Sequence, residues 1–401
     1  MVLERTASLG VEPVRVADAA GRILAEAVTS TDAVPSFDNS AMDGYAVRAA
    51  DTTTASAETP LTLALVGESR AGHPAGEAIG PGEAIAISTG AMLPDGADAV
   101  VRVEDTDGAR QGQVSIEVAV ETGRDTRYAG DDIAAGDVVL EAGVELGAAE
   151  IGVLAAVGRA KVVCARRPRI AVLTTGDELQ EPGEPLQHGA IRNSNAHSLA
   201  ALVAAAGAEL AFTEIVADTP EATEAALGRA LTTDIAVISG GVSVGPHDHV
   251  KPALEKLGAH EVFWGVALRP GKPTWFGVAP RRQGLGPGRG LVFGLPGNPV
   301  SAMVTFLLFV RPAIRAMLGS ADAAPRATAI LDEPYPKAPG RAHLVRCKLE
   351  LRDDGWHARS TGEQGSHVLT SMLGAEALAI IPTESGDVAA GERVEIELLG
   401  K

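Results

Sequence analysis

Residues 169–323 show continuous apolar runs that alternate with amphipathic stretches. Apolar runs bounded by turn residues are typical of strands buried on both faces, and the amphipathic stretches have helical spacing. The predicted strands are 169–175, 208–216, 234–240 and 290–295, and the predicted helices are 194–208, 219–232, 250–259 and a long one that begins at Pro299. This alternation predicts a doubly wound α/β domain with a parallel sheet.

The rest of the chain has a different pattern. Between residues 60 and 143, short β-branched runs alternate with Gly, Pro and Asp turns, which is typical of a small all-β unit. Helical patterns flank this unit, at 18–28 and 147–158, so we predict that it is inserted into one helical domain. The predicted boundaries are 1–30 and 144–168 for the helical domain, 31–143 for the inserted β domain, 169–323 for the α/β domain and 324–401 for a second β domain.

The composition excludes some classes of partner. The chain has 401 residues, with 34 Lys and Arg against 52 Asp and Glu and a net charge of −18. This charge argues against a nucleic-acid binder and against a protein held on a membrane by basic residues. The longest apolar run, 300–310, has 11 residues and is too short to span a bilayer. Cys164 and Cys347 form no CxxC pair, so we expect a cytoplasmic protein without a disulfide framework.

The charge is uneven along the chain. The window 261–350 contains twelve Lys and Arg against five acids, a local net charge of +7, which leaves −25 for the rest. An acidic protein that keeps one basic stretch can use it to bind a small anion. Chance clustering of surface arginines explains the same numbers, so both interpretations stay open.

Three loops follow the predicted strands of the α/β domain: TTGDEL (174–179), SGGVSVGPHD (239–248) and GLPGNPVS (294–301). Doubly wound sheets bind ligands outside the carboxyl ends of their strands. The glycines of SGGVSVG allow close backbone approach to an anion, and a helix follows them. A tight turn that binds nothing is the alternative, because the loop is neither a Walker loop nor GxGxxG. Asn298 and Pro299 suit the N-cap and first position of a helix, which explains GLPGNPVS without function.

Four carboxylates follow these strands: Asp177, Glu178, Asp218 and Asp248. A single acid there is most simply a cap or a surface charge. Four acids beside anion-binding loops favour a bridging Mg²⁺, because carboxylates that face phosphate without a metal would repel it. The segment 35–46, which contains Asp38 and Asp43, has the composition of a linker.

Seven motifs occur in order along nearly the whole chain: PSFDNSAMDGYA, ISTGAMLPDGADAVV, LTTGDEL, SGGVSVGPHD, LRPGKP, GLPGNPVSA and QGSH. In this combination the chain resembles the molybdopterin molybdenumtransferase (MoeA) family, to which the E domain of gephyrin is similar. SGGVSVG alone also resembles the molybdopterin adenylyltransferases and competence-damage-type proteins, but those lack SAMDGYA and both flanking β domains.

The resemblance implies a fold of four domains: an α/β molybdopterin-binding domain, a discontinuous helical domain, an inserted β domain and a C-terminal β barrel. It implies a homodimer whose active site draws on both subunits, and contacts with other molybdenum cofactor enzymes. The implied reaction inserts molybdate into the dithiolene of adenylylated molybdopterin and releases AMP in a Mg²⁺-dependent step.

The resemblance also assigns roles at matching motif positions. The residues implied as catalytic are Asp43, Thr89, Glu178, Asp218 and Asp248, of which Glu178 and Asp248 are the implied Mg²⁺ ligands. The residues implied to bind substrate are Ser239, Gly240, Gly241, Ser243, Gly245, Arg269, Lys272, Pro296, Gly297, Asn298, Pro299, Arg341, Arg346 and Ser366. The choice between Arg341 and Arg346 as the ligand contact stays open. Arg269 stands where lysine is usual in this motif, so a guanidinium fork replaces a point charge.

Two other functions fit the same residues. One is a non-enzymatic scaffold that clusters a partner through its C-terminal domain, as the gephyrin comparison allows; the intact acidic cluster argues against it. The other is molybdopterin adenylyltransferase activity, which consumption of ATP in the absence of molybdate would favour. The sequence does not choose between molybdate and tungstate.

Overall fold

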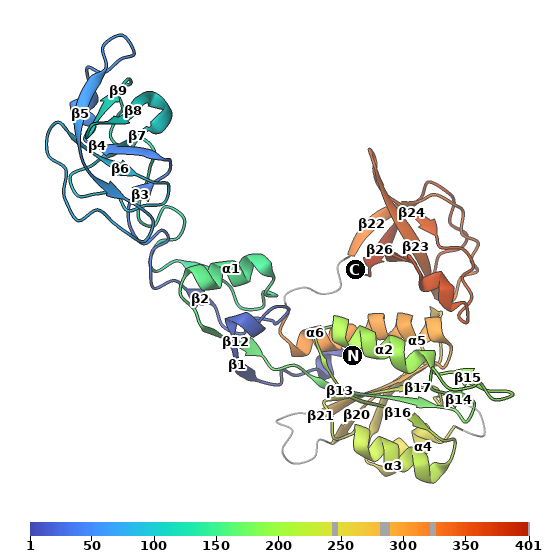
Figure 1. Cartoon of the computed structure of the whole chain (residues 1–401). Helices are drawn as coiled ribbons and strands as arrows, with labels where there is room; N and C mark the ends of the chain where they lie inside the picture. Colours follow the sequence, from blue (N-terminus) through green and yellow to red (C-terminus); the bar gives the residue numbers. More distant parts are fainter. Residues whose placement is uncertain (243–247, 281–288, 321–325, 400–401) are drawn as a thin grey trace.

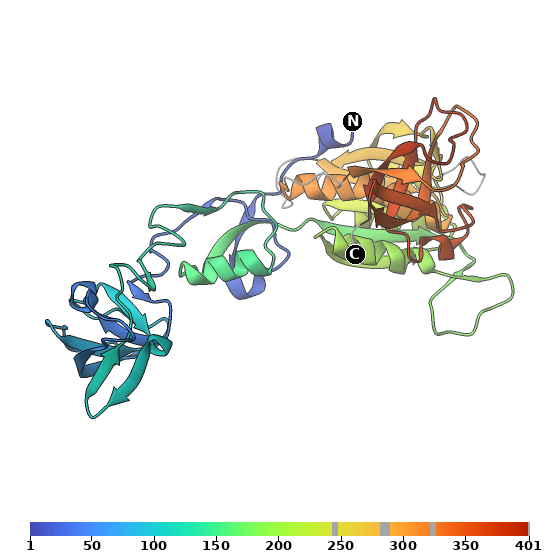
Figure 2. The same cartoon turned by 90° about the horizontal axis from the view of Figure 1, so that it is seen from above.

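The structure is a computed structural model, and it describes residues 1–242, 248–280, 289–320 and 326–399. The molecule is elongated (Figure 1, Figure 2). A small β domain forms one end, and an α/β domain with a β barrel beside it forms the other. A narrow region that contains β1, β2, β12 and α1 connects the two ends.

The α/β domain is built on a six-stranded sheet with the order β16-β13-β17-β21-β20-β18. Its strands are β13 (Arg169–Thr175), β16 (Glu209–Val216), β17 (Ile235–Ser239), β18 (His260–Trp264), β20 (Trp275–Pro280) and β21 (Arg289–Leu295). All four predicted strands are present and parallel. Two further strands, β18 and β20, were not predicted, and they make the sheet mixed because β20 runs antiparallel to both of its neighbours, β21 and β18. β20 and β21 are consecutive strands that pair directly, and the eight residues between them are too few for the crossover that parallel pairing needs.

Helices cover both faces of this sheet (Figure 1). They are α2 (Ser194–Ala205), α3 (Pro220–Ala230), α4 (Val250–Lys256), α5 (Pro299–Thr305) and α6 (Arg311–Met317). Side chains of α2, α5 and α6 pack on one face and those of α3 and α4 on the other. α3 begins as predicted: Thr219 accepts a hydrogen bond from Ala222 N, and Pro220 occupies the first turn.

One long helix separates the sheet from the barrel. α5, a π-helical turn (Phe306–Val310) and α6 run together from Pro299 to Met317, 19 residues that are long and apolar enough to cross a membrane. This helix exceeds the run of 11 apolar residues seen in the sequence. Its side chains pack against two different domains, however: Phe306 packs against the sheet, and Val304 packs against barrel residues. It is therefore a core helix shared by two domains, with 61% of its apolar window buried.

The connecting region is discontinuous in sequence. β1 (Val11–Arg15) pairs antiparallel with β12 (Lys161–Ala165), and β2 (Val28–Thr29) pairs with β11 (Val138–Leu140). Only α1 (Ala148–Ala156) matches the predicted helices of this described region. The helix predicted over 18–28 is wrong. Ile23 and Leu24 are buried through isolated bridges to residues of the second segment, and Gly21 adopts φ +69°, which a helix does not allow.

The inserted domain is a six-stranded sheet with the order β7-β4-β6-β5-β9-β8. Its strands are β4 (Gly44–Val47), β5 (Leu61–Ser69), β6 (Glu83–Ile87), β7 (Ala99–Arg102), β8 (Thr106–Arg110) and β9 (Gln113–Ile116), and β3 (Asn39–Ser40) pairs beside them with β10 (Thr126–Arg127). The segment 35–46 is not a linker, because it supplies β3 and the start of β4, which lies between β7 and β6 in the sheet. Gly44 is required there: a Cβ would lie 2.0 Å from Val101 O.

The C-terminal domain is a closed barrel, as the resemblance implies. Its strands are β22 (Arg326–Leu331), β23 (Ala342–Arg352), β24 (Gly355–Ser360), β25 (Ala377–Ile381) and β26 (Arg393–Leu398). The order β23-β24-β22-β26-β25 closes through pairing of β25 with β23. β19 (Leu268–Arg269) of the preceding domain adds to β23, and the 3-10 helix Leu369–Met372 contacts α5. The barrel is thus tied to the α/β domain on two sides.

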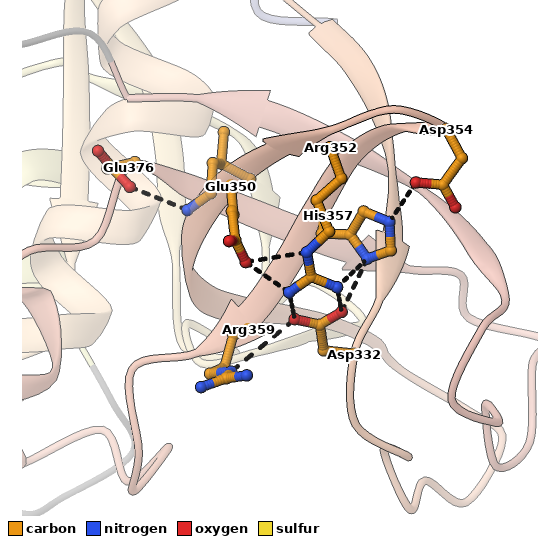
Figure 3. Close-up of polar contacts among 8 residues, drawn as sticks. Asp332, Glu350, Arg352, Asp354, His357, Arg359 and Glu376 are labelled. Atoms are coloured by element: carbon orange, nitrogen blue, oxygen red, sulfur yellow. Dashed lines mark hydrogen bonds and ion pairs between the residues drawn. The ribbon is translucent and has the colours of Figure 1, made fainter.

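An ion cluster covers part of the barrel surface (Figure 3). His357 lies between two carboxylates: its Nδ1 is 2.8 Å from Asp332 Oδ1, and its Nε2 is 2.8 Å from Asp354 Oδ1. Arg352 donates two hydrogen bonds of 2.9 Å to Asp332, and Arg359 lies 3.8 Å from the same carboxylate. The hydrogen bonds to Asp332 and then Asp354 raise the pKa of His357, and they lower the pKa of both aspartates.

These shifts predict how stability depends on pH. Folding raises the His357 pKa above its ordinary 6.5, so its contribution is complete below that pH and is lost as the pH rises through the folded pKa. The lowered aspartate pKa values contribute above pH 3.8, and this is lost as the pH falls through their folded values. We expect the Tm of the full chain to fall between about pH 6 and pH 9 more steeply than that of His357→Gln. Equal slopes for the two proteins would contradict the assignment.

Candidate functional site

A cleft of about 310 Å³ lies where the α/β sheet meets the barrel. Strand ends, the start of α2 and the barrel segment 367–369 line it: Thr174, Thr175, Glu178, Leu179, Ile191, Arg192, Asn193, Ser194, Asn195, Ser239, Gly297, Pro299, His367 and Leu369. A larger and more open depression, about 760 Å³, lies at the opposite end of the sheet beside Arg169 and α3. We assign the function to the smaller cleft, because the predicted loops converge there and ligands bind at the carboxyl ends of parallel strands.

The glycine loop after β17 packs tightly against the end of β13. Gly240 and Gly241 have φ angles of +96° and +60°, and a Cβ on either would come within 2.9 Å of Thr175 Oγ1. Glycine is therefore required at both positions to bring the two loops together. Ser243 and Gly245 lie outside the described residues, so the approach of this loop to an anion stays a prediction.

Hydrogen bonds join two of the acids, Asp177 and Asp218. Asp218 N donates to Asp177 Oδ1 at 3.1 Å, and Asp177 N donates to Asp218 Oδ2 at 3.4 Å. These reciprocal bonds tie the loop after β16 to the loop after β13. Asp218 therefore has a structural task beside any catalytic one.

The other two acids differ in exposure. Glu178 is exposed and lines the cleft, and its carboxylate lies over Gly176, where a Cβ would be 2.4 Å from Oε2. The carboxylate oxygens of Asp248 are shielded from solvent. Among the described residues no three acids, histidines or cysteines come together as a metal site. The protein alone thus provides at most a partial ligand set for Mg²⁺ in the part of the chain that is described.

The loop after β21 connects the cleft to the barrel. Asn298 occupies the N-cap and Pro299 begins α5, as predicted, but the Asn298 side chain makes no capping hydrogen bond. Asn298 Nδ2 instead donates to Ser366 Oγ at 3.0 Å, and Val300 N donates to Ser366 O at 3.1 Å. Two predicted site motifs, LPGNP and QGSH, therefore meet at a direct contact between domains.

Two asparagines at the start of α2 were missed by the sequence analysis. Asn193 caps α2 by accepting from Ala196 N, and it donates to Thr174 Oγ1 at 3.0 Å. Asn195 Nδ2 donates to Ser239 Oγ at 2.9 Å and to Gly297 O at 2.8 Å. An Asn directly before an apolar periodic segment is a helix-start signal that could have flagged Asn193. No local pattern connects Asn195 to the loops that it joins.

The predicted cations are not equivalent. Arg269, Lys272 and Arg341 are exposed, and Arg269 lies on β19 beside the barrel. Arg346 is only 1% exposed. Its guanidinium donates to Ser371 Oγ and to Gly365 O, each at 3.2 Å, and burial lowers its pKa. Arg346 therefore holds the segment that carries Ser366, and Arg341 is the exposed one of the two arginines.

Asp43 and Thr89 come together in the inserted domain. Asp43 Oδ1 accepts hydrogen bonds from Thr89 N at 2.6 Å and from Thr89 Oγ1 at 3.0 Å, and these bonds lower the pKa of Asp43. Both residues are exposed. Their domain lies at the far end of the molecule from the α/β domain (Figure 1). Within one chain, the pair is therefore separated from the cleft.

Three family models together match most of the chain. They are the MoeA N-terminal region (domain I and II) over residues 1–158, a probable molybdopterin binding domain over 171–316 and the MoeA C-terminal region (domain IV) over 328–399. The molybdopterin molybdenumtransferase of Haemophilus influenzae is 38% identical over 390 residues, with 96% of this chain and 93% of that protein covered. The chain belongs to the MoeA family. It is accordingly a transferase of molybdenum cofactor biosynthesis.

Other MoeA relatives agree with this assignment. A molybdopterin molybdenumtransferase from Nostoc is 39% identical over 93% of this chain and 85% of that protein. Gephyrin from Dictyostelium discoideum is 34% identical over 97% of this chain but only 59% of gephyrin. The crystal structure of the molybdopterin biosynthesis MoeA protein from Pyrococcus horikoshii superposes with a TM-score of 0.82 at 35% identity, covering 100% of this chain and 97% of that one.

Proposed function

We propose that the enzyme inserts molybdate into the dithiolene of adenylylated molybdopterin and releases AMP in a Mg²⁺-dependent step. The observation that carries this proposal is the convergence of TTGDEL, SGGV, LPGNP and the barrel segment around one cleft. The Asn298–Ser366 contact makes the barrel part of this cleft. A site between two domains suits a ligand with separate pterin, phosphate and nucleotide parts.

The charges fit anionic ligands. Molybdate, phosphate and the phosphoanhydride are all negative, and Arg269, Lys272 and Arg341 are exposed cations near the boundary between the domains. The net charge of −18 disfavours binding of nucleic acids and anionic membranes, but these local cations would allow a small oxyanion to bind. We expect the enzyme to act in the cytoplasm.

Glu178 and Asp248 are the residues that would hold Mg²⁺. Carboxylate oxygens are the donors that this ion prefers, and it commonly uses one or two of them together with substrate phosphates and water. An incomplete protein ligand set is therefore compatible with the ion, and the substrate would supply the rest. Bound Mg²⁺ would neutralise charge on the phosphoanhydride. Glu178, which is exposed in the cleft, would orient the water that cleaves the bond to AMP.

We propose that the enzyme works as a homodimer, because Asp43 and Thr89 lie far from the cleft of their own chain (Figure 1). In a symmetric dimer, the inserted domain of one subunit can reach the cleft of the other. The exposed, ionised Asp43 would then complete the partner's site. The product would pass to other enzymes of the cofactor pathway, with which we expect contacts.

One assay tests the proposed reaction. Adenylylated molybdopterin, Mg²⁺ and molybdate are supplied to the purified protein, and AMP and protein-bound molybdenum are measured together. We expect both products to form in equal amounts and only in the presence of Mg²⁺. Absence of AMP would point to a scaffold. Consumption of ATP without molybdate would point to an adenylyltransferase. AMP formation with tungstate but not with molybdate would mean that the inserted metal is tungsten.

A further inference from the structure

Asn195 occupies a junction between three elements of the cleft. It lies in the first turn of α2, and its Nδ2 bridges Ser239 Oγ at the end of β17 and Gly297 O in the loop after β21. Ser239 Oγ in turn donates to Pro296 O at 3.2 Å. Asn195 therefore fixes two adjacent carbonyls of this turn: it bonds the Gly297 carbonyl directly and the Pro296 carbonyl through Ser239.

These contacts fix the orientation of the carboxamide. Gly297 O can only accept, so the amide nitrogen must face it, and both Nδ2 hydrogens are then used. The oxygen Oδ1 points elsewhere. It is buried from solvent, and no donor of the described residues bonds to it. A buried carbonyl oxygen without a donor costs free energy that a bound donor would recover.

We propose that Asn195 is a positioning and binding residue for the pterin part of the substrate. Its Nδ2 sets the spacing of the loops after β17 and β21, and its Oδ1 accepts a hydrogen bond from an N–H of the bicyclic heterocycle. A pterin offers such donors in its amino and lactam groups, whereas molybdate offers none. This inference rests on the proposed function and adds a substrate contact that none of the predicted motifs contains.

The test separates binding from folding by steady-state kinetics with each substrate varied in turn. For Asn195→Ala we expect the KM for adenylylated molybdopterin to rise about tenfold, the loss of one buried hydrogen bond to the ligand. The KM for molybdate and kcat per folded molecule should change less than about threefold. Asn195→Asp, which keeps the size but places an acceptor against Gly297 O, should be impaired at least as strongly.

The matched control is Thr233→Val, at the opposite end of the same sheet. Thr233 Oγ1 is buried and lies 2.7 Å from Ala230 O and 2.8 Å from Ile235 O, so the substitution also removes a hydroxyl held between two carbonyls. It should lower Tm without changing either KM. An unchanged pterin KM in Asn195→Ala, with normal turnover by the wild type, would overturn the inference alone. Absence of wild-type turnover would overturn the proposed function instead.

Discussion

Replacement of Glu178 by alanine is expected to reduce AMP release at least about 100-fold, the range lost when a positioned acid, base or metal ligand is removed. Glu178 is exposed within the cleft, and its carboxylate makes no hydrogen bond or ion pair with the described residues, so truncation of the side chain should leave the fold intact. Binding of molybdopterin, measured by pterin fluorescence, should be retained. Asp248→Ala should reduce AMP release to a similar extent, because the two carboxylates are proposed to hold one ion.

The control for both variants is Glu209→Ala. Glu209 is an exposed carboxylate at the opposite end of the same sheet, where it pairs with Arg169 at 3.4 Å. Its removal should leave AMP release unchanged, since a surface ion pair contributes little. Full AMP release by both Glu178→Ala and Asp248→Ala would remove the acids from the mechanism.

Mixing two inactive variants is expected to restore activity. If Asp43 acts in the partner's cleft, a mixed dimer of Asp43→Ala and Glu178→Ala contains one site with both residues intact and one with neither. Random exchange makes half of the dimers mixed, so about a quarter of wild-type activity should return. The measurement is AMP release after the two purified variants are mixed, unfolded together and refolded.

Two control samples are needed to interpret the recovery of activity. Each variant refolded alone should stay inactive, and a mixture of Glu178→Ala with Asp248→Ala should also stay inactive, because both residues belong to the same cleft of one chain. Activity from the Asp43 and Glu178 mixture with none from the second mixture supports a shared site. No recovery in either mixture, at normal dimer content, would contradict a site shared between the two subunits.

Much of the fold could be predicted because it depends on local patterns. Buried parallel strands have continuous apolar runs, and Thr219 with Pro220 specifies the start of α3 within a few residues. The failed prediction of a helix at 18–28 has a non-local explanation: the apolar residues suit a helix, but Ile23 and Leu24 pair with residues 145 and 164. Such pairing depends on a segment more than 100 residues away, and no window of the sequence contains it.

The site was predicted unevenly for the same reason. Glycine loops and acids at strand ends follow from fold class, because parallel strands bring their carboxyl ends to one edge. The residue type alone did not reveal whether a side chain is buried or exposed. Arg346 carries the same charge as Arg341, yet one is buried among carbonyl and hydroxyl acceptors and the other is exposed.

The sequence by itself determined the alternation of strands and helices, the glycines required at tight turns and the family, because these depend on local spacing and on ordered motifs. The tertiary structure decided which polar groups meet. Asn195 joins loops that lie 44 and 102 residues away, and the Asn298 side chain bonds Ser366 of the barrel instead of a backbone N–H of its own helix. Hydrogen bonds depend on distances of about 3 Å in space, and those distances are set only when the domains pack.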